Sequence, residues 1–236
     1  MKAVYIPTDS GELYCRISGS GKPLLLLHGN GEDHSVFQHQ MTFFSQYYTV
    51  IAVDTRGHGQ SNRGDTELTF EQFIRDVKAV LDYLNIKRTT IIGFSDGGNT
   101  ALLFAERYPE RVYALIVVGA NVKAEGMSSY ELQKVKWTVN FLQCVGKVYP
   151  PAKLKREVVD LMFNQLKNTC FKLSAIQAPT LVMAGENDVI KRSHTKMIAH
   201  YIQNSQLLIV PKADHFFIVS QSDIFNRAAL KFLKNH

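Results

Sequence analysis

The sequence lacks long hydrophobic runs and contains few cysteines. Uninterrupted apolar runs such as Leu24–Leu27 and Ala114–Val118 are far too short to span a bilayer. The cysteines are odd in number and never spaced as Cys-x-x-Cys, so we expect neither a disulfide scaffold nor a zinc ribbon; they are Cys15, Cys144 and Cys170. No apolar block follows Met1, and a signal peptide is therefore not expected. These absences favour a cytoplasmic protein.

Charged residues are also scarce. Only 20% of the 236 residues are charged and 45% are apolar, which argues against disorder and for one large domain with a substantial core. The net charge of +6 is concentrated in residues 121–178, which contain nine basic and four acidic residues. The basic residues are Lys123, Lys134, Lys136, Lys147, Lys153, Lys155, Arg156, Lys167 and Lys172. No nucleic-acid-binding motif accompanies them, so we interpret the segment as a solvated helix surface. We expect no nucleic-acid partner and no membrane partner.

Short apolar segments alternate with longer amphipathic ones, which is the pattern of a mostly parallel α/β sheet. The clearest helix runs from about Phe70 to Leu84, because its apolar residues recur every three or four positions after a capping Thr69. Another helix is expected over residues 96–108. The predicted strands are residues 3–6, 13–18, 24–28, 49–54, 89–94, 112–118, 180–184 and 207–210.

Residues 121–178 interrupt the alternation. They contain two helix-like segments, Ser129–Val145 and Lys153–Leu166, on either side of Tyr149-Pro150-Pro151. Helices inserted late in such a sheet often form a lid over one of its edges. We therefore predict a core domain made of residues 1–120 and 179–236, with a helical lid at 121–178.

The strongest functional motif is GFSDGG at residues 93–98. It follows an apolar strand and opens a helix, as a nucleophile elbow requires. Ser95 would lie at a sharp turn from which its hydroxyl projects above the sheet. The turn brings residues 93 and 97 against each other, which explains why both are glycine. A Gly-rich turn without chemistry is the alternative, and the strand–turn–helix context favours a nucleophilic Ser95.

A second Gly-rich motif, HGNG at residues 28–31, directly follows the strand at 24–27. Acyl transfer generates an oxyanion, and a backbone N–H group that points at it contributes about 2.7–4 kcal/mol to its stabilisation. Asn30 and Asp96, the residue after Ser95, are the expected donors. A dinucleotide-binding loop is excluded because His34 stands where the third glycine is needed. A purely structural turn remains the alternative.

A serine nucleophile needs a base, and the base needs an orienting acid. His215 follows the strand at 207–210, where a loop side chain can reach over the sheet. Asp188 follows the strand at 180–184, and Glu186 in the same loop is the rival acid. The chain order Ser95, Asp188, His215 is the one expected on a sheet of this kind.

These motifs make the chain resemble the α/β-hydrolase fold family over nearly its whole length. A further motif, DTRGHGQS at residues 54–61, is similar to a stretch that is frequent after the fourth strand in that family. The resemblance implies an α/β-hydrolase fold: a mostly parallel eight-stranded sheet flanked by helices, with a small helical lid insertion. It also implies that Ser95, Asp188 and His215 form a catalytic triad that works without a metal or cofactor.

The elbow, with Asp after Ser and then GGNTAL, is similar to that of valacyclovir hydrolase-like α-amino-acid esterases. This similarity implies that the Asp96 carboxylate pairs with a substrate ammonium group. The alternative is that Asp96 only caps the helix that it begins. Trp137, Phe141 and Met162 belong to the predicted lid helices, where they either pack or line an apolar acyl pocket.

The sequence therefore predicts a serine hydrolase that cleaves a small carboxylic ester or related acyl compound through an acyl-enzyme intermediate. Acyl transfer or perhydrolysis on the same residues is one alternative. A ligand sensor with little turnover is another, although the complete set of Ser95, Asp188 and His215 disfavours it. The partner is a small-molecule acyl substrate, and the sequence leaves open whether the protein is a monomer or a homodimer.

Overall fold

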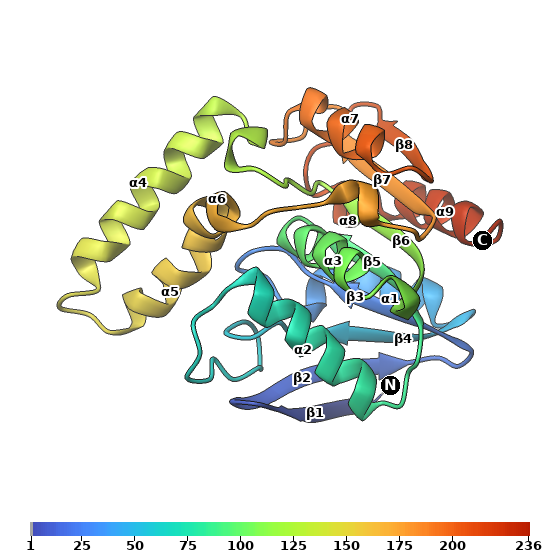
Figure 1. Cartoon of the computed structure of the whole chain (residues 1–236), viewed down its shortest axis with the longest axis horizontal. Helices are drawn as coiled ribbons and strands as arrows, with labels where there is room; N and C mark the ends of the chain where they lie inside the picture. The colour runs from blue at the N-terminus through green and yellow to red at the C-terminus, as the bar shows by residue number, and fades with distance from the viewer. Residues whose placement is uncertain (1) are drawn as a thin grey trace.

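An eight-stranded sheet forms the centre of the computed structural model, which describes residues 2–236 (Figure 1). The strand order is β1-β2-β4-β3-β5-β6-β7-β8. β2 pairs antiparallel with β1 and β4, and all other pairs are parallel. The mostly parallel eight-stranded sheet is thus confirmed. Its strands are β1 (Lys2–Thr8), β2 (Gly11–Ser18), β3 (Lys22–Leu27), β4 (Tyr48–Val53), β5 (Thr89–Phe94), β6 (Val112–Val118), β7 (Thr180–Gly185) and β8 (Ser205–Val210).

Two hydrophobic cores cover the two faces of the sheet, because successive residues of a strand point to opposite sides. In β5, Ile91 belongs to one core and Ile92 to the other. The first core lies against α2, α3 and α7, and the second against α1, α8 and α9. The helices outside residues 121–178 are η1 (His34–Phe37), α1 (Gln38–Phe44), α2 (Phe70–Tyr83), α3 (Asp96–Arg107), η2 (Pro109–Arg111), α7 (Arg192–Tyr201), α8 (Phe217–Ser220) and α9 (Ser222–Leu233).

The two helices predicted at residues 70–84 and 96–108 are present as α2 and α3. α2 begins after Thr69, whose hydroxyl accepts a hydrogen bond from the Gln72 N–H at 3.0 Å, so the expected cap is confirmed. α3 ends at Arg107, shortly before Pro109, because a proline cannot continue the helical hydrogen bonding.

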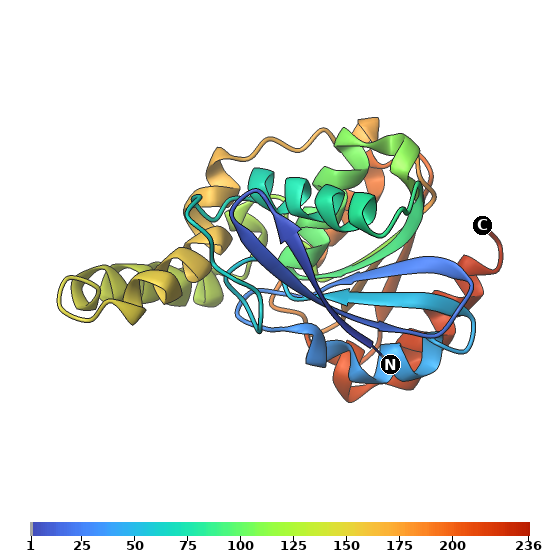
Figure 2. The same ribbon diagram turned by 90° about the horizontal axis from the view of Figure 1, so that it is seen from below.

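Helices also fill the insertion between β6 and β7. In chain order they are η3 (Ala124–Gly126), α4 (Ser129–Val145), α5 (Pro151–Asp160), the π-helical η4 (Leu161–Gln165), α6 (Leu166–Asn168) and η5 (Leu173–Ala175). Both views show α4 and α5 as a hairpin that projects away from the sheet (Figures 1 and 2). We call residues 129–160 the α4–α5 hairpin. Among residues 2–236, no helix is long and apolar enough to cross a membrane.

Arg56, in the loop after β4, is a buried cation that ties three parts of the core together. Its side chain is 1% exposed. Its guanidinium donates two hydrogen bonds to the Asp76 carboxylate of α2, at 2.9 and 2.6 Å. The same group donates to Asp9 in the turn between β1 and β2 at 2.9 Å. The Arg56 charge thus orders the loop rather than facing a substrate.

Replacing Arg56 by Ala should strongly destabilise the protein, because it leaves the Asp76 carboxylate buried without its cation. We expect the free energy of unfolding in urea to fall by about 3–5 kcal/mol. Arg107→Ala is the matched control, since the Arg107–Glu71 ion pair is about half exposed and should contribute less than about 1 kcal/mol. Equal losses for the two variants would contradict the role assigned to Arg56.

Candidate active site

Ser95 lies on the sharp turn between β5 and α3. Its backbone is in a strained region, with φ of 52° and ψ of −119°. The turn can form only because its flanking residues lack side chains. A Cβ on Gly93 would lie 2.4 Å from the Gly97 carbonyl oxygen, and a Cβ on Gly97 would lie 2.0 Å from the Leu27 carbonyl oxygen. The predicted close approach to residue 97 thus explains the glycine at 93, whereas the glycine at 97 is required by the end of β3.

The structure brings Ser95, His215 and Asp188 together from three loops at the carboxyl ends of β5, β8 and β7. The His215 Nδ1 atom lies 2.8 Å from Asp188 Oδ1, and its Nε2 atom lies 3.2 Å from Ser95 Oγ. Because a carboxylate only accepts hydrogen bonds, the proton belongs on Nδ1, which leaves Nε2 free to accept the Ser95 proton. This arrangement can activate a serine hydroxyl.

Gly119, at the end of β6, gives the His215 ring its space. Its φ of 59° favours glycine, and a Cβ there would lie 2.6 Å from His215 Cε1. On the other side, the Phe94 ring packs against the imidazole with a centroid distance of 4.9 Å. Sequence reasoning missed Gly119, although a glycine directly after an apolar strand was a signal for it.

Glu186, the rival acid, does not reach His215. Its carboxylate is exposed and accepts a hydrogen bond from the Lys212 N–H at 2.9 Å, so it connects the loops after β7 and β8. Asp188, in contrast, has a side chain that is almost fully buried, and its Oδ1 also accepts from the Ile190 N–H at 2.9 Å. The geometry therefore favours Asp188 as the partner of His215.

The Asp96 carboxylate is buried beneath Asn30 and is 5% exposed. Asn30 Nδ2 donates to one of its oxygens at 2.9 Å, and Asn99 Nδ2 donates to the other at 3.0 Å. Burial raises the pKa of Asp96 to about 6, although these two hydrogen bonds oppose the rise. These hydrogen bonds leave each oxygen able to accept another, so the pairing of Asp96 with a substrate ammonium group stays a prediction. In this structure the side chain orders the loop that carries Asn30.

Glu32 is a site residue that sequence reasoning missed. Its Oε2 atom accepts a hydrogen bond from the Gly29 N–H at 3.0 Å. A Cβ on Gly29 would lie 2.9 Å from Ser95 Cβ and 3.1 Å from Glu32 Oε2, so the carboxylate is close to Ser95. Burial raises the pKa of Glu32 to about 7, and its position near Asp96 adds to the rise. No sequence pattern distinguishes this acid from an ordinary loop residue.

A cavity of about 480 Å³ opens beside Ser95 and His215. Its lining combines the polar loops of the core with apolar residues of the insertion, including Val135, Val159 and Met162. The expectation that Trp137 and Phe141 also line it is wrong. Their side chains are 71% and 66% exposed on the outer face of α4, because the helix turns Val135 and Val139 toward the protein instead.

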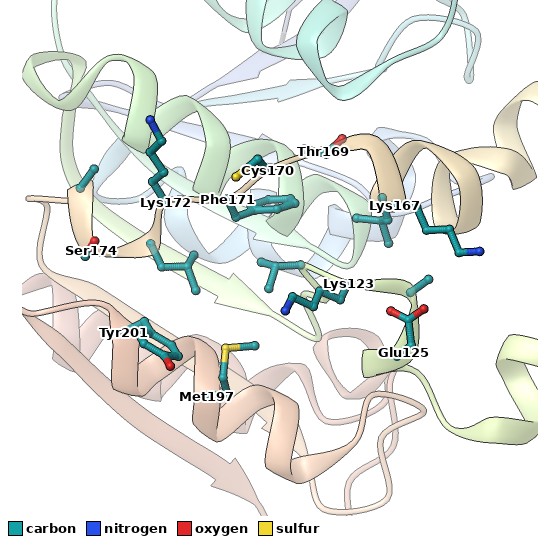
Figure 3. Close-up of a pocket in the computed structure, with 15 residues that line it drawn as sticks. Lys123, Glu125, Lys167, Thr169, Cys170, Phe171, Lys172, Ser174, Met197 and Tyr201 are labelled. Atoms are coloured by element: carbon teal, nitrogen blue, oxygen red, sulfur yellow. The ribbon is translucent and has the colours of Figure 1, made fainter.

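A larger cavity, of about 750 Å³, lies elsewhere, between the segment that returns from the insertion and α7 (Figure 3). Lys123, Lys167 and Cys170 line it together with Met197 and Tyr201 of α7. Of the described residues that border it, none is Ser95, Asp188 or His215. Size alone therefore does not identify the reactive site.

Asp33, His34 and Asp54 are close enough to one another to bind a metal ion, with their candidate ligand atoms within 4.8 Å. The carboxylate of Asp54, the buried residue of the three, already accepts hydrogen bonds from within the protein. It accepts from the His34 backbone N–H at 2.7 Å and from the Gln60 N–H at 2.9 Å, and it lies 2.7 Å from the His34 ring. The cluster holds together the loops after β3 and β4.

Comparisons with known proteins find relatives over nearly the whole chain. A family model described as alpha/beta hydrolase fold matches residues 22–143. Human Serine hydrolase BPHL is 31% identical, in an alignment that covers 97% of this chain and 85% of that protein. The 3-oxoadipate enol-lactonase 2 of Acinetobacter baylyi is 26% identical, with 94% and 92% covered. A solved hydrolase structure from Pseudomonas aeruginosa shares the fold, with a TM-score of 0.80, 23% identity and 98% of each chain covered.

Asp188→Asn should reduce kcat on the order of 10⁴-fold, because an amide at this position favours the wrong tautomer of His215. Glu186→Gln should stay within about tenfold of the parent, since the Glu186 carboxylate accepts a hydrogen bond from the Lys212 backbone and none from His215. Steady-state hydrolysis of a chromogenic ester by both variants measures the difference. The assignment of the acid fails if the Glu186 variant is the more damaged of the two.

Proposed function

Because the chain belongs to the α/β-hydrolase fold family and is a hydrolase, we propose that it is a serine hydrolase that cleaves small carboxylic esters or related acyl compounds. The observation that carries this proposal is the continuous chain of contacts from Asp188 through His215 to Ser95. A cavity of suitable size for a small molecule adjoins it. Relatives named as a serine hydrolase and an enol-lactonase support cleavage of an ester or of a lactone, which is an internal ester.

In the proposed reaction, His215 Nε2 takes the hydroxyl proton of Ser95 while Oγ attacks the ester carbonyl carbon. Asp188 keeps the Nδ1 proton in place and stabilises the imidazolium that forms. His215 then donates its proton to the departing alcohol as the carbonyl of the acyl-enzyme reforms. Water repeats the sequence on the acyl-enzyme, which releases the carboxylic acid and regenerates Ser95.

We assign the oxyanion to the backbone N–H groups of Asn30 and Asp96. The support for this assignment is that the two residues are held together by the hydrogen bond from Asn30 Nδ2 to the Asp96 carboxylate. Asn30 Nδ2 also donates to the Val158 carbonyl oxygen of α5 at 2.5 Å, so the insertion contacts the same loop. Two such donors would together supply several kcal/mol of transition-state stabilisation, at about 2.7–4 kcal/mol each.

The insertion, residues 121–178, is proposed to act as the lid that selects the substrate. The residues assigned to the chemistry all lie in the core domain of residues 1–120 and 179–236. The insertion contributes apolar side chains such as Val135 and Met162 to the cavity. We therefore infer that it sets the size and polarity of the acyl or alcohol group and takes no part in the proton transfers.

Ser95→Ala should lose on the order of 10⁴- to 10⁶-fold in kcat, because the nucleophile and its partners act as one unit. The measurement is a panel of p-nitrophenyl esters of varied chain length, with amino-acid esters, amides and lactones alongside. A fluorophosphonate probe followed by peptide mapping should label Ser95 in the parent. Labelling of another residue, or equal activity of the variant, would overturn the proposal.

The same panel separates the alternative reactions. Product analysis with an added alcohol or peroxide distinguishes hydrolysis from acyl transfer and perhydrolysis. A ligand sensor would bind members of the panel and turn them over at most slowly in both the parent and Ser95→Ala.

Glu32 should make the preference for a cationic substrate depend on pH. With a pKa of about 7, it is neutral in acid and carries a negative charge in base, so its attraction for a substrate cation appears as the pH rises. We expect the ratio of kcat/KM for butyrylcholine to that for 3,3-dimethylbutyl butyrate to increase about tenfold from about pH 6 to about pH 8. This ester pair differs in charge but hardly in shape, and neither ester titrates in that range.

Glu32→Gln should flatten this dependence while retaining an oxygen for the Gly29 N–H. The other charged groups that act on Glu32 are His215, Asp96 and Asp33, and all of them remain in the variant. Glu131→Gln is the matched control, because Glu131 borders the same cavity but lies 3.4 Å from the Lys134 ammonium group. If the ratio of the two kcat/KM values changes with pH by the same factor in the parent and in Glu32→Gln, Glu32 is excluded as the source of the pH dependence.

A further inference from the structure

The outer face of α4 carries a stripe of exposed aromatic side chains. Tyr130, Trp137 and Phe141 are separated by seven and four positions, so they lie along one side of the helix. All three are more than half exposed, and Val148 and Tyr149 continue the apolar surface at the tip of the hairpin. We call these five residues the aromatic stripe.

Packing within the protein does not explain the aromatic stripe. The opposite side of α4 supplies the contacts that hold the helix in place, through Val135 and Val139, which pack with Met127 and Ile190. Because the hairpin projects from the core, its outer face is not covered by the rest of the chain (Figures 1 and 2). Single exposed apolar residues are common on proteins, but a contiguous row of them marks an interaction surface.

The charges on the hairpin identify the kind of partner. Within residues 129–160, all of which the structure describes, every exposed charged residue is a lysine; these are Lys134, Lys147, Lys153 and Lys155. The acids of the hairpin are less exposed and have partners. Glu131 lies beside Lys134, Glu157 pairs with Arg63 at 2.5 Å, and Asp160 accepts from Asn164. Lys134 is thus compensated by Glu131, whereas Lys147, Lys153 and Lys155 have no acid paired with them among the described residues. A hairpin that combines exposed aromatic rings with these cations is complementary to a surface that is apolar and anionic.

We propose that the α4–α5 hairpin binds the surface of an anionic lipid bilayer, with the aromatic stripe in the interfacial region and the lysines at the headgroups. Tyrosine and tryptophan favour this region because one end of each ring is apolar and the other polar. A helix that lies in the interface needs no spanning segment. The expectation of no membrane partner rested on the lack of such segments and does not address this mode of binding.

A second copy of the chain is a less suitable occupant of the aromatic stripe. Pairing two hairpins through this face would bring two sets of exposed lysines together without acids to neutralise them. Like charges at an interface oppose association. The charge of the hairpin thus favours an anionic bilayer over self-association.

Trp137 provides a direct test, because it is the only tryptophan in the chain. The full-length protein is mixed with phosphatidylcholine vesicles, with or without added phosphatidylglycerol, and emission, acrylamide quenching and co-sedimentation are measured. We expect a shift of emission to shorter wavelength, less quenching and co-sedimentation with the anionic vesicles only. Raising the ionic strength from about 0.1 M to about 1 M should release the protein, because it shortens the Debye length from about 10 Å to about 3 Å.

The variants keep Trp137 as the reporter. Tyr130→Ser/Phe141→Ser and Lys147→Gln/Lys153→Gln/Lys155→Gln should each weaken vesicle binding more than about tenfold, by removing apolar contact and headgroup attraction respectively. Tyr83→Ser/Tyr201→Ser is the matched control, since it removes two exposed aromatics outside the hairpin and should leave binding unchanged. Circular dichroism and fluorophosphonate labelling verify that each variant is folded.

Two results would overturn the proposal. One is unchanged emission and sedimentation of the folded parent with anionic vesicles. The other is a lipid-independent shift of Trp137 emission that grows with protein concentration together with a dimer in analytical ultracentrifugation, which would assign the aromatic stripe to a second copy. Both readouts are independent of ester hydrolysis, so failure here is distinguishable from failure of the proposed function.

Discussion

The close approach of backbone segments at Ser95 is the constraint on which the rest of the site depends. A non-glycine residue with a φ of 52° costs on the order of 1–3 kcal/mol, and the fold has to hold it there. It does so through a 2.8 Å hydrogen bond from the Ser95 N–H to Val118 O and through the contact of Gly97 with the end of β3. Because these contacts join β3, β5 and β6, the loops that follow the three strands are fixed relative to the serine hydroxyl. The helix α3 then begins directly after Ser95, at Asp96.

Acidic groups dominate the electrostatics of this space. Asp188, Glu32 and Asp96 all lie near Ser95 or His215, and the structure compensates each of them with hydrogen bonds from N–H groups. In the proposed reaction His215 becomes positively charged, and the same carboxylates then favour that charge. The interaction between His215 and each of Glu32 and Asp96 opposes the rise that burial causes in the pKa of these two acids. Acidic groups around the site would thus stabilise the imidazolium but oppose the oxyanion, so the proposed mechanism depends on the backbone donors that we assign to Asn30 and Asp96.

The sequence predicts the sheet, the elbow and the pairing of Asp188 with His215, because each follows from a local pattern. Loops after parallel strands meet at one edge of a sheet, so a Ser, an Asp and a His in such loops are expected to come together. Two features needed three-dimensional information. Glu32 differs from other loop acids only in being packed against Gly29 and Ser95, which no periodicity encodes. For α4 the pattern is ambiguous, since Val135 and Val139 form one apolar row and Trp137 and Phe141 form another, and the sequence does not tell which row faces the protein.

The two sides of α4 serve the two proposed roles, the selection of the substrate and the binding of a bilayer surface. Its inner side borders the cavity through Val135 and Thr138, and its outer side carries Trp137 and Phe141. Because an α-helix is rigid over this length, a force on the outer face moves the inner face with it. α5 extends the connection to the reactive loop, since its Val158 carbonyl oxygen accepts a hydrogen bond from Asn30. Binding of the hairpin to a surface would therefore act on the cavity wall and on Asn30, the proposed oxyanion donor, without any change in Ser95, His215 or Asp188.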